Sequence, residues 1–250
     1  MRKTIAAQAA YQMRLYLRSP RALVAAALTP LALMVLLAAI SDHRAEPGYE
    51  EWLAASMATL GLASMCYTTL AASLVASRDA GVLKRLFATP LPLWAHLAGR
   101  VLATVAVALV QAAVLFAVAR LAYGAALPTA WTAGVGLLLG AVALCSIGLA
   151  VAQVVPRGDA AATLLSSTLL PVVLVSGVFF PVDRLPGWVA RVAEFSPLTH
   201  TGALVGGEGG WAHFAWLLGW TAVALAFTRW RFRLEPFTPG RPRGLRRSVA

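Results

Sequence analysis

Six long stretches of this 250-residue chain contain no charged residue, and this segregation of charge constrains the fold more than any other feature. A helix that crosses the hydrocarbon core of a bilayer needs roughly 20 mostly apolar residues, and each stretch is long enough for one span. Only 12% of all residues are charged, whereas soluble domains carry about 25%. The sequence therefore predicts an all-α integral membrane protein. The stretches without Asp, Glu, Lys or Arg are 22–41, 52–77, 101–119, 121–156, 160–182 and 209–228.

Six membrane-spanning helices are predicted from these stretches. The stretch 121–156 could hold two spans, but Tyr123, Gly124, Pro128 and Thr129 are typical of a turn. We therefore expect a tight hairpin at 120–130 and a single helix after it. Residues 1–230 form one transmembrane domain in this interpretation, and residues 231–250 form a basic tail. The predicted spans are 22–41, 52–76, 101–120, 131–155, 160–181 and 211–228.

The distribution of positive charge orients the spans. Of the 21 Lys and Arg residues, 17 fall on the side that holds both termini and 4 on the other side. Because Lys and Arg collect in cytoplasmic segments, both termini are predicted to be cytoplasmic. The tail carries Arg241, Arg243, Arg246 and Arg247; such a cluster also suits nucleic acid, but we favour contact with anionic membrane lipid and expect no nucleic-acid partner.

Two segments outside the spans are predicted to be helical. Residues 1–20 place Ile5, Ala9, Met13, Tyr16 and Leu17 at near-helical spacing, with cationic residues around them. This pattern is typical of a helix that lies in the membrane interface. After the fifth span, Gly and Pro residues surround a short amphipathic piece at 188–195, which predicts a short outer helix before the sixth span.

Small residues and prolines mark positions within the spans. Gly136 and Gly140 form a G-x-x-x-G pattern in the fourth span. Such patterns permit close helix packing, and we favour ordinary packing over a special role in a dimer. Pro30 and Pro171 lie inside the first and fifth spans, where proline interrupts helical hydrogen bonding.

Motifs for catalysis or nucleotide binding are missing from the sequence. It contains no G-x-x-x-x-G-K-[ST] and no H-E-x-x-H. The spans also lack Asp and Glu, the residues that often serve ion-coupled transporters. Gln111 could line a path or form an interhelical hydrogen bond. If the chain transports a substrate uphill, the energy must therefore come from another polypeptide.

A basic segment at 77–100 interrupts the apolar sequence between the second and third spans. Residues 79–88 are predicted to form a short helix, with Val82, Leu83, Leu86 and Phe87 on one face. Arg78, Lys84 and Arg85 lie on the opposite face. The helix could lie on the membrane surface, or it could bind in a groove of a soluble partner. The pattern alone leaves both interpretations open.

Two stretches resemble the permeases of the ABC-2 type transporter family. The first is Gly81-Val-Leu-Lys-Arg-Leu-Phe-Ala-Thr-Pro90-Leu91, between spans two and three. The second is Leu174-Val-Ser176-Gly177-Val-Phe-Phe180-Pro181 with Leu185-Pro186-x-Trp188, followed by Ser196-Pro197-Leu198-Thr199. Both occupy the places expected in a six-span permease, although Ser77-Arg78-Asp79 has one acidic residue fewer than many relatives.

The resemblance implies the membrane subunit of an ATP-driven exporter in a bacterial inner membrane. Such a subunit moves a hydrophobic or amphiphilic substrate, either drug-like or a lipid-linked glycan, and pairs with a second permease. ATP and Mg²⁺ would bind a separate ATPase subunit, so neither a cofactor nor enzymatic activity is expected in this chain. The resemblance implies a coupling helix at Gly81, Val82, Leu83, Lys84, Arg85, Leu86, Phe87, Thr89 and Pro90, a connecting helix with Arg14, Tyr16, Leu17 and Arg18, and a pathway past Gln111, Ser176, Phe179 and Phe180.

Two alternatives remain open from the sequence. The chain could be a secondary transporter or channel that works without an ATPase. It could also be a membrane enzyme acting on lipid, whose acid and base groups would come from Glu50, Glu51, Glu194 and His200 on the outer side.

Overall fold

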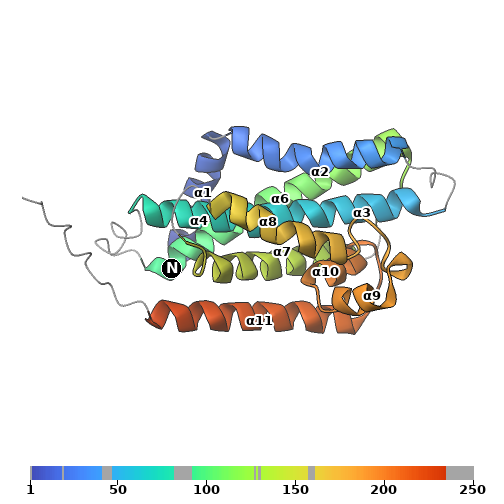
Figure 1. Cartoon of the computed structure of the whole chain (residues 1–250). Coiled ribbons are helices and arrows are strands. Elements are labelled where there is room, and N and C mark those ends of the chain that lie inside the picture. Colours follow the sequence, from blue (N-terminus) through green and yellow to red (C-terminus); the bar gives the residue numbers. More distant parts are fainter. Residues whose placement is uncertain are drawn as a thin grey trace, which may run out of the picture.

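Every regular element in the described part of the chain is a helix. The computed structural model describes residues 2–18, 20–40, 47–81, 92–126, 128, 131–156 and 161–234. The long helices lie side by side along one axis, with α1 at one end of the bundle and α9 and α10 at the other (Figure 1). We call these the α1 end and the α9–α10 end. The elements are α1 (Arg2–Arg18), α2 (Pro20–Ile40), α3 (Tyr49–Leu62), η2 (Ala63–Thr69), α4 (Leu70–Asp79), α6 (Leu93–Tyr123), α7 (Trp131–Ala152), α8 (Ala161–Val175), η3 (Val182–Arg184), α9 (Gly187–Ala193), α10 (Pro197–Val205) and α11 (Trp211–Leu234).

Four helical runs are long and apolar enough to cross a membrane: Tyr49–Asp79, Trp94–Tyr123, Trp131–Ala152 and Trp211–Arg231. The predicted spans at 52–76, 101–120 and 211–228 are helical throughout, and the predicted span at 131–155 is helical up to Ala152. The spans at 22–41 and 160–181 stay predictions. Helix α2 does cover 21 residues, but α8 has only 15.

The fifth predicted span ends earlier than the sequence suggested. Helix α8 stops at Val175, and Gly177 follows with a φ of 78°. This left-handed backbone strongly favours glycine, and it turns the chain away from the helix axis before Pro181. The Cβ that any other residue would add at position 177 would lie 2.5 Å from Cγ2 of Val182.

A turn follows the third predicted span, but it begins at Gly124 and not at residue 120, and residues 127, 129 and 130 of the predicted hairpin lie outside the described part of the chain. Helix α6 ends with Gly124 in the left-handed conformation, at a φ of 73°. The Gly124 N–H donates to the Arg120 carbonyl and the Ala125 N–H to the Ala119 carbonyl, each at 3.2 Å. The first of these bonds runs from the left-handed residue to the carbonyl four residues earlier, which is the αL motif that satisfies a carbonyl at a helix C-terminus.

Helix α7 packs closely on its neighbours through glycines. A Cβ at Gly140 would lie 2.4 Å from Cγ2 of Thr201, and one at Gly136 would lie 2.5 Å from Cβ of Leu204. Both partners belong to α10. The G-x-x-x-G pattern therefore serves packing within the subunit, as the sequence predicted.

The segment between α8 and α11 contains more helix than expected. The predicted outer helix corresponds to α9, but a second helix, α10, follows it directly. Ser196 caps α10 by accepting a hydrogen bond from the Leu198 N–H at 3.3 Å, and Pro197 occupies the first turn, where proline is well tolerated. Helix α10 packs against α7 and α11, so it is part of the bundle.

Candidate functional site

The predicted coupling helix lies mainly outside the described residues, which stop at Gly81 and resume at Pro92. Helix α4 ends at Asp79, and the Gly81 N–H donates to the Arg78 carbonyl at 3.1 Å. Pro92 then immediately precedes α6. The segment 82–91 therefore connects α4 to α6, and the prediction that it forms a coupling helix remains untested.

A ladder of three hydrogen bonds joins α1 to α6 at the α1 end. In every pair the two residues are 88 positions apart, and each helix advances by four residues, about one turn, from one pair to the next. The two helices therefore run parallel and in register. The pairs are Gln8 Oε1 with His96 Nδ1 at 3.2 Å, Gln12 Oε1 with Arg100 Nε at 3.5 Å, and Tyr16 OH with Thr104 Oγ1 at 2.8 Å.

The close approach of these two helices depends on Gly99. A Cβ at this position would lie 2.6 Å from Cβ of Gln8 and 3.0 Å from the backbone nitrogen of Ala9. No real side chain tolerates such distances without a shift. The small residue thus places the glutamines of α1 within reach of the polar side chains of α6.

Arg100 connects this ladder to a third helix. Its side chain is 8% exposed, and besides bonding Gln12 it donates to Ser77 Oγ at 3.0 Å and to the Ser73 carbonyl at 3.4 Å. Both serines belong to α4. A guanidinium offers five N–H donors in a fixed plane, which lets one side chain hold α1, α4 and α6 together. We call this set of contacts the Arg100 junction.

The predicted connecting helix takes part in this junction through only one of its four named residues. Tyr16 is partly buried and bonds to Thr104, and burial raises the pKa of its phenol above the ordinary value of 10.0. Arg14, Leu17 and Arg18 are exposed. The sequence analysis missed Gln8, Gln12, His96 and Arg100. Their spacing of four residues on each helix was a visible signal, but nothing showed that the two sets meet.

A groove lies between α2, η2 and α8, with a volume of about 460 Å³. Its wall on η2 carries the hydroxyls of Ser64, Thr68 and Thr69. The π-helix η2 is a form that occurs mostly as a single turn, often at functional sites. Among the described residues, the buried Thr68 hydroxyl has no hydrogen-bond partner. The predicted pathway residue Phe179 lines this groove.

The other three predicted pathway residues lie elsewhere. Ser176 lines a cavity of about 660 Å³ at the α9–α10 end. Phe180 is 58% exposed. Gln111 is buried, and its Nε2 atom lies 2.9 Å from the Cβ that an alanine would add at Gly61, so its side chain packs between α6 and α3. The structure therefore does not gather the four residues at one place.

Histidines and aromatic residues fix the α9–α10 end to α11. His200 Nε2 donates to the Glu194 carbonyl at 2.8 Å, and its Nδ1 lies 2.9 Å from Nδ1 of His213. Because a carbonyl only accepts, Nε2 of His200 carries the proton in the neutral ring. The other ring nitrogen of His200, Nδ1, is therefore an acceptor, and the Nδ1–H of His213 donates to it. The His200 ring also stacks on Trp216 with an interplanar angle of 10°. The alternative of a membrane enzyme named Glu50, Glu51, Glu194 and His200 as its acid and base groups. Of these, Glu51 lines the cavity of about 660 Å³ at the α9–α10 end, and His200 contacts His213, which also lines that cavity.

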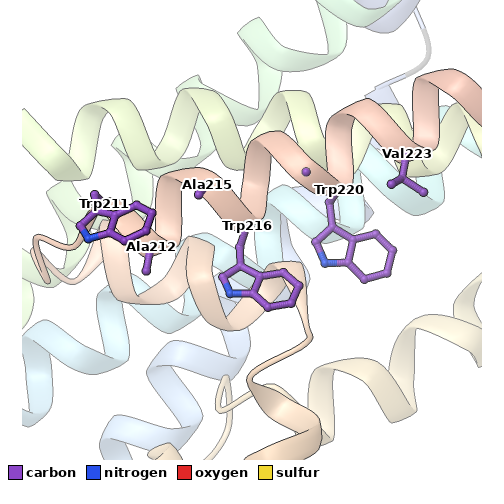
Figure 2. A pocket seen from close by; sticks show the side chains of 7 residues that line it. Trp211, Ala212, Ala215, Trp216, Trp220 and Val223 are labelled. Atoms are coloured by element: carbon purple, nitrogen blue, oxygen red, sulfur yellow. The ribbon is translucent and has the colours of Figure 1, made fainter.

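A shallow groove of about 520 Å³ runs along the exposed face of α11. Figure 2 shows Trp211, Trp216 and Trp220 along this face, with small residues between them. The Trp220 Nε1–H donates to the Phe195 carbonyl at 3.0 Å. The lining is almost entirely apolar, so this surface suits contact with lipid and offers no group for acid–base chemistry.

Comparison with known proteins agrees with this architecture. Residues 5–205 match the family described as ABC-2 type transporter. The chain is also 26% identical over 151 residues to a protein described as "Probable multidrug ABC transporter permease YbhR" in Escherichia coli strain K12, and equally to the protein of that description in Escherichia coli O157:H7. Each alignment covers 59% of this chain and 39% of the relative, so the chain spans about two fifths of the length of these curated relatives. Since the family match extends over most of the sequence, the chain belongs to the ABC-2 type transporter family.

Proposed function

We propose that this chain is the membrane-spanning permease subunit of an ATP-driven exporter that works with a separate ATPase subunit. In this proposal six spans cross a bacterial inner membrane with both termini in the cytoplasm. The segment 81–90 contacts the ATPase, and a second permease completes the path. Family membership and the multidrug permease description of the relatives support the proposal.

The Arg100 junction is the observation that carries the proposal. It ties together the two helices that flank the segment 82–91, namely α4 and α6, and it adds α1 to them. A force applied to the segment would therefore reach three helices at once. A partner that changes shape on ATP hydrolysis needs such a rigid connection, because coupling is carried by packed elements and hydrogen-bond networks.

The lining of the groove between α2, η2 and α8 favours an amphiphilic substrate. It combines apolar side chains with the hydroxyls of Ser64, Thr68, Thr69 and Ser166, which suits a molecule that is mostly apolar and carries a few polar groups. We propose that the substrate passes along this groove, with Phe179 at its wall, and that a second permease covers the open side.

Association with the ATPase is the direct test. The variant Leu83→Ala/Leu86→Ala/Phe87→Ala removes the predicted apolar face of the coupling segment. We expect it to lose co-purification with the ATPase and substrate-stimulated ATP hydrolysis in liposomes, while the permease itself still folds.

A control variant removes three exposed apolar side chains elsewhere. The variant Val110→Ala/Val114→Ala/Leu121→Ala acts on α6, where all three side chains are at least 50% exposed, and should keep both association and transport. If the coupling-segment variant retained both activities, the assignment of residues 81–90 would be wrong. If the purified chain transported substrate under an ion gradient without any ATPase, the ATP-driven function itself would fail.

A further inference from the structure

The cavity at the α9–α10 end has the size of a small-molecule site. Four segments surround it: the start of α3, the turn after α8, the helix α10 and the connection to α11. Its volume of about 660 Å³ falls within the roughly 300–1,000 Å³ typical of ligand pockets. Its lining residues are Gly48, Glu51, Trp52, Ala55, Ser56, Ser176, Gly177, Val178, Pro181, Val182, Leu198, Thr199, Gly202, Ala203, Gly206, Glu208 and His213.

The charge of the lining is one-sided. Glu51 and Glu208 are both carboxylates, and none of the described lining residues is Lys or Arg. Glu51 is held in position, because its Oε1 atom accepts a hydrogen bond from the Ala126 N–H at 3.0 Å. A carboxylate has about four lone-pair sites on two oxygens, so it retains acceptor capacity for a ligand in the cavity.

One hydroxyl in the lining has no hydrogen-bond partner among the described residues. Thr199 donates its hydroxyl proton to the Ser176 carbonyl at 3.0 Å, and the Ser176 hydroxyl donates to the Val172 carbonyl at 2.5 Å. Ser56 differs from both. It is only 5% exposed, yet no hydrogen bond joins it to another described residue. Because Ser56 lines the cavity, its hydroxyl is available to a polar atom of a ligand there.

The remaining wall is apolar and includes the indole of Trp52. Val178, Pro181, Val182 and Leu198 provide aliphatic surface beside it. Indole faces attract cations through the ring quadrupole, and a carboxylate in a partly enclosed site acts through a lower dielectric than in water. An anionic ligand would meet repulsion from both Glu51 and Glu208. A cationic ligand would be attracted by both carboxylates.

From the carboxylates, the indole and the unpaired hydroxyl together, we infer that this cavity binds a cationic amphiphile, a molecule with a positively charged centre and a bulky apolar body. The inference does not rest on the proposed ATP-driven function, because binding to the permease chain needs no ATPase.

Binding of tetraphenylphosphonium to the full-length chain in phosphatidylcholine nanodiscs tests this inference. Isothermal titration calorimetry, with empty nanodiscs subtracted, should show saturable binding to the chain. Tetraphenylborate has the same shape and the opposite charge, and it should show no saturable binding to the chain. The variant Glu51→Gln/Glu208→Gln should weaken tetraphenylphosphonium binding by at least about tenfold, because glutamine keeps the acceptor for the Ala126 N–H but removes the charge.

The matched control is Glu50→Gln/Glu194→Gln, which removes two carboxylates from the same end of the bundle without changing the lining. Its affinity should remain within about twofold of the unaltered chain. The single variant Glu208→Gln changes an exposed residue and provides a second measurement if the double variant fails to fold; it should weaken binding by at least about threefold. Absence of saturable binding to the unaltered chain, equal affinity for tetraphenylborate, or unchanged affinity in the folded Glu51 and Glu208 variants would overturn the inference.

Discussion

Replacing Gly140 with alanine tests the packing of α10 on α7 most directly. The added methyl group would lie 2.4 Å from Cγ2, 2.7 Å from Oγ1 and 3.1 Å from Cβ of Thr201. Carbon atoms in contact normally stay about 3.5–4.0 Å apart, so α10 would have to move by roughly 1 Å. Thr201 cannot easily rotate away, because its χ1 angle is restricted by β-branching and its hydroxyl donates to the Pro197 carbonyl at 2.8 Å.

The expected cost follows from these distances. Overpacking a tight interior typically costs about 1–3 kcal/mol. We expect Gly140→Ala to lower the melting temperature of the purified chain by roughly 2–4 °C for each kcal/mol, the scale for chains of this size. Gly134→Ala is the control on the same helix, since no atom lies within 4 Å of its added Cβ. It should be neutral or stabilising by up to about 1 kcal/mol, because alanine favours helix over glycine.

A double variant separates the clash from any general effect of the substitution. Thr201→Ala removes the two closest atoms and leaves only Cβ at 3.1 Å. Gly140→Ala should therefore cost less in a Thr201→Ala background than in the unaltered chain, with a coupling of about 0.5–3 kcal/mol. Equal melting temperatures for Gly140→Ala and Gly134→Ala, or additive effects in the double variant, would refute the close packing of α10 on α7.

Three further predictions concern other contacts. Arg100→Met should free α1 and speed tryptic cleavage at Arg14 by several fold, since bonds to a charged group contribute about 1.5–3 kcal/mol each; Arg100→Lys should restore only part of the protection. Gly148→Ala should destabilise more than Gly140→Ala, because its Cβ would meet backbone oxygens of η2 at 2.7 and 3.2 Å, which cannot rotate away. Burial lowers the pKa of His200 below 6.5, so the unfolded chain binds more protons and the melting temperature should fall as the pH drops below about 6.5; His200→Asn should reduce this slope in thermal scans.

Four of the predicted spans coincide with long apolar helices because hydropathy identifies such segments. Each is 18–25 residues long and mostly apolar, with at most one charged residue, and this property belongs to the segment itself. The predicted end of the fifth span was wrong. Ser176–Phe180 is as apolar as a membrane-spanning helix, whereas the turn that ends α8 depends on the φ of Gly177. Helix α10 was not predicted, although Ser196 and Pro197 are residues typical of a helix start. Pro197 occupies the first turn of a helix that becomes stable by packing on α7.

The candidate site was harder to predict because its residues meet only in three dimensions. The stripe with Ile5, Ala9 and Met13 correctly marked one side of α1, and these residues are half-buried. The same side also carries Gln8 and Gln12, which a search for apolar residues ignores. The π-helix η2 has no sequence signal of its own. Its backbone lies close to Gly148 on another helix, a contact that no local pattern reveals.

The constant offset of 88 between α1 and α6 restricts how these helices can slide. A shift of one or two residues would break all three pairs and leave buried polar groups without partners. A shift by a full turn would instead place Gln12 opposite His96 and Tyr16 opposite Arg100, which are again polar pairs. Gln12 would also replace Gln8 beside Gly99, so the close approach would be preserved. A slide that restores polar pairs is thus a step of four residues, or about 6 Å, whereas shifts of one or two residues are disfavoured.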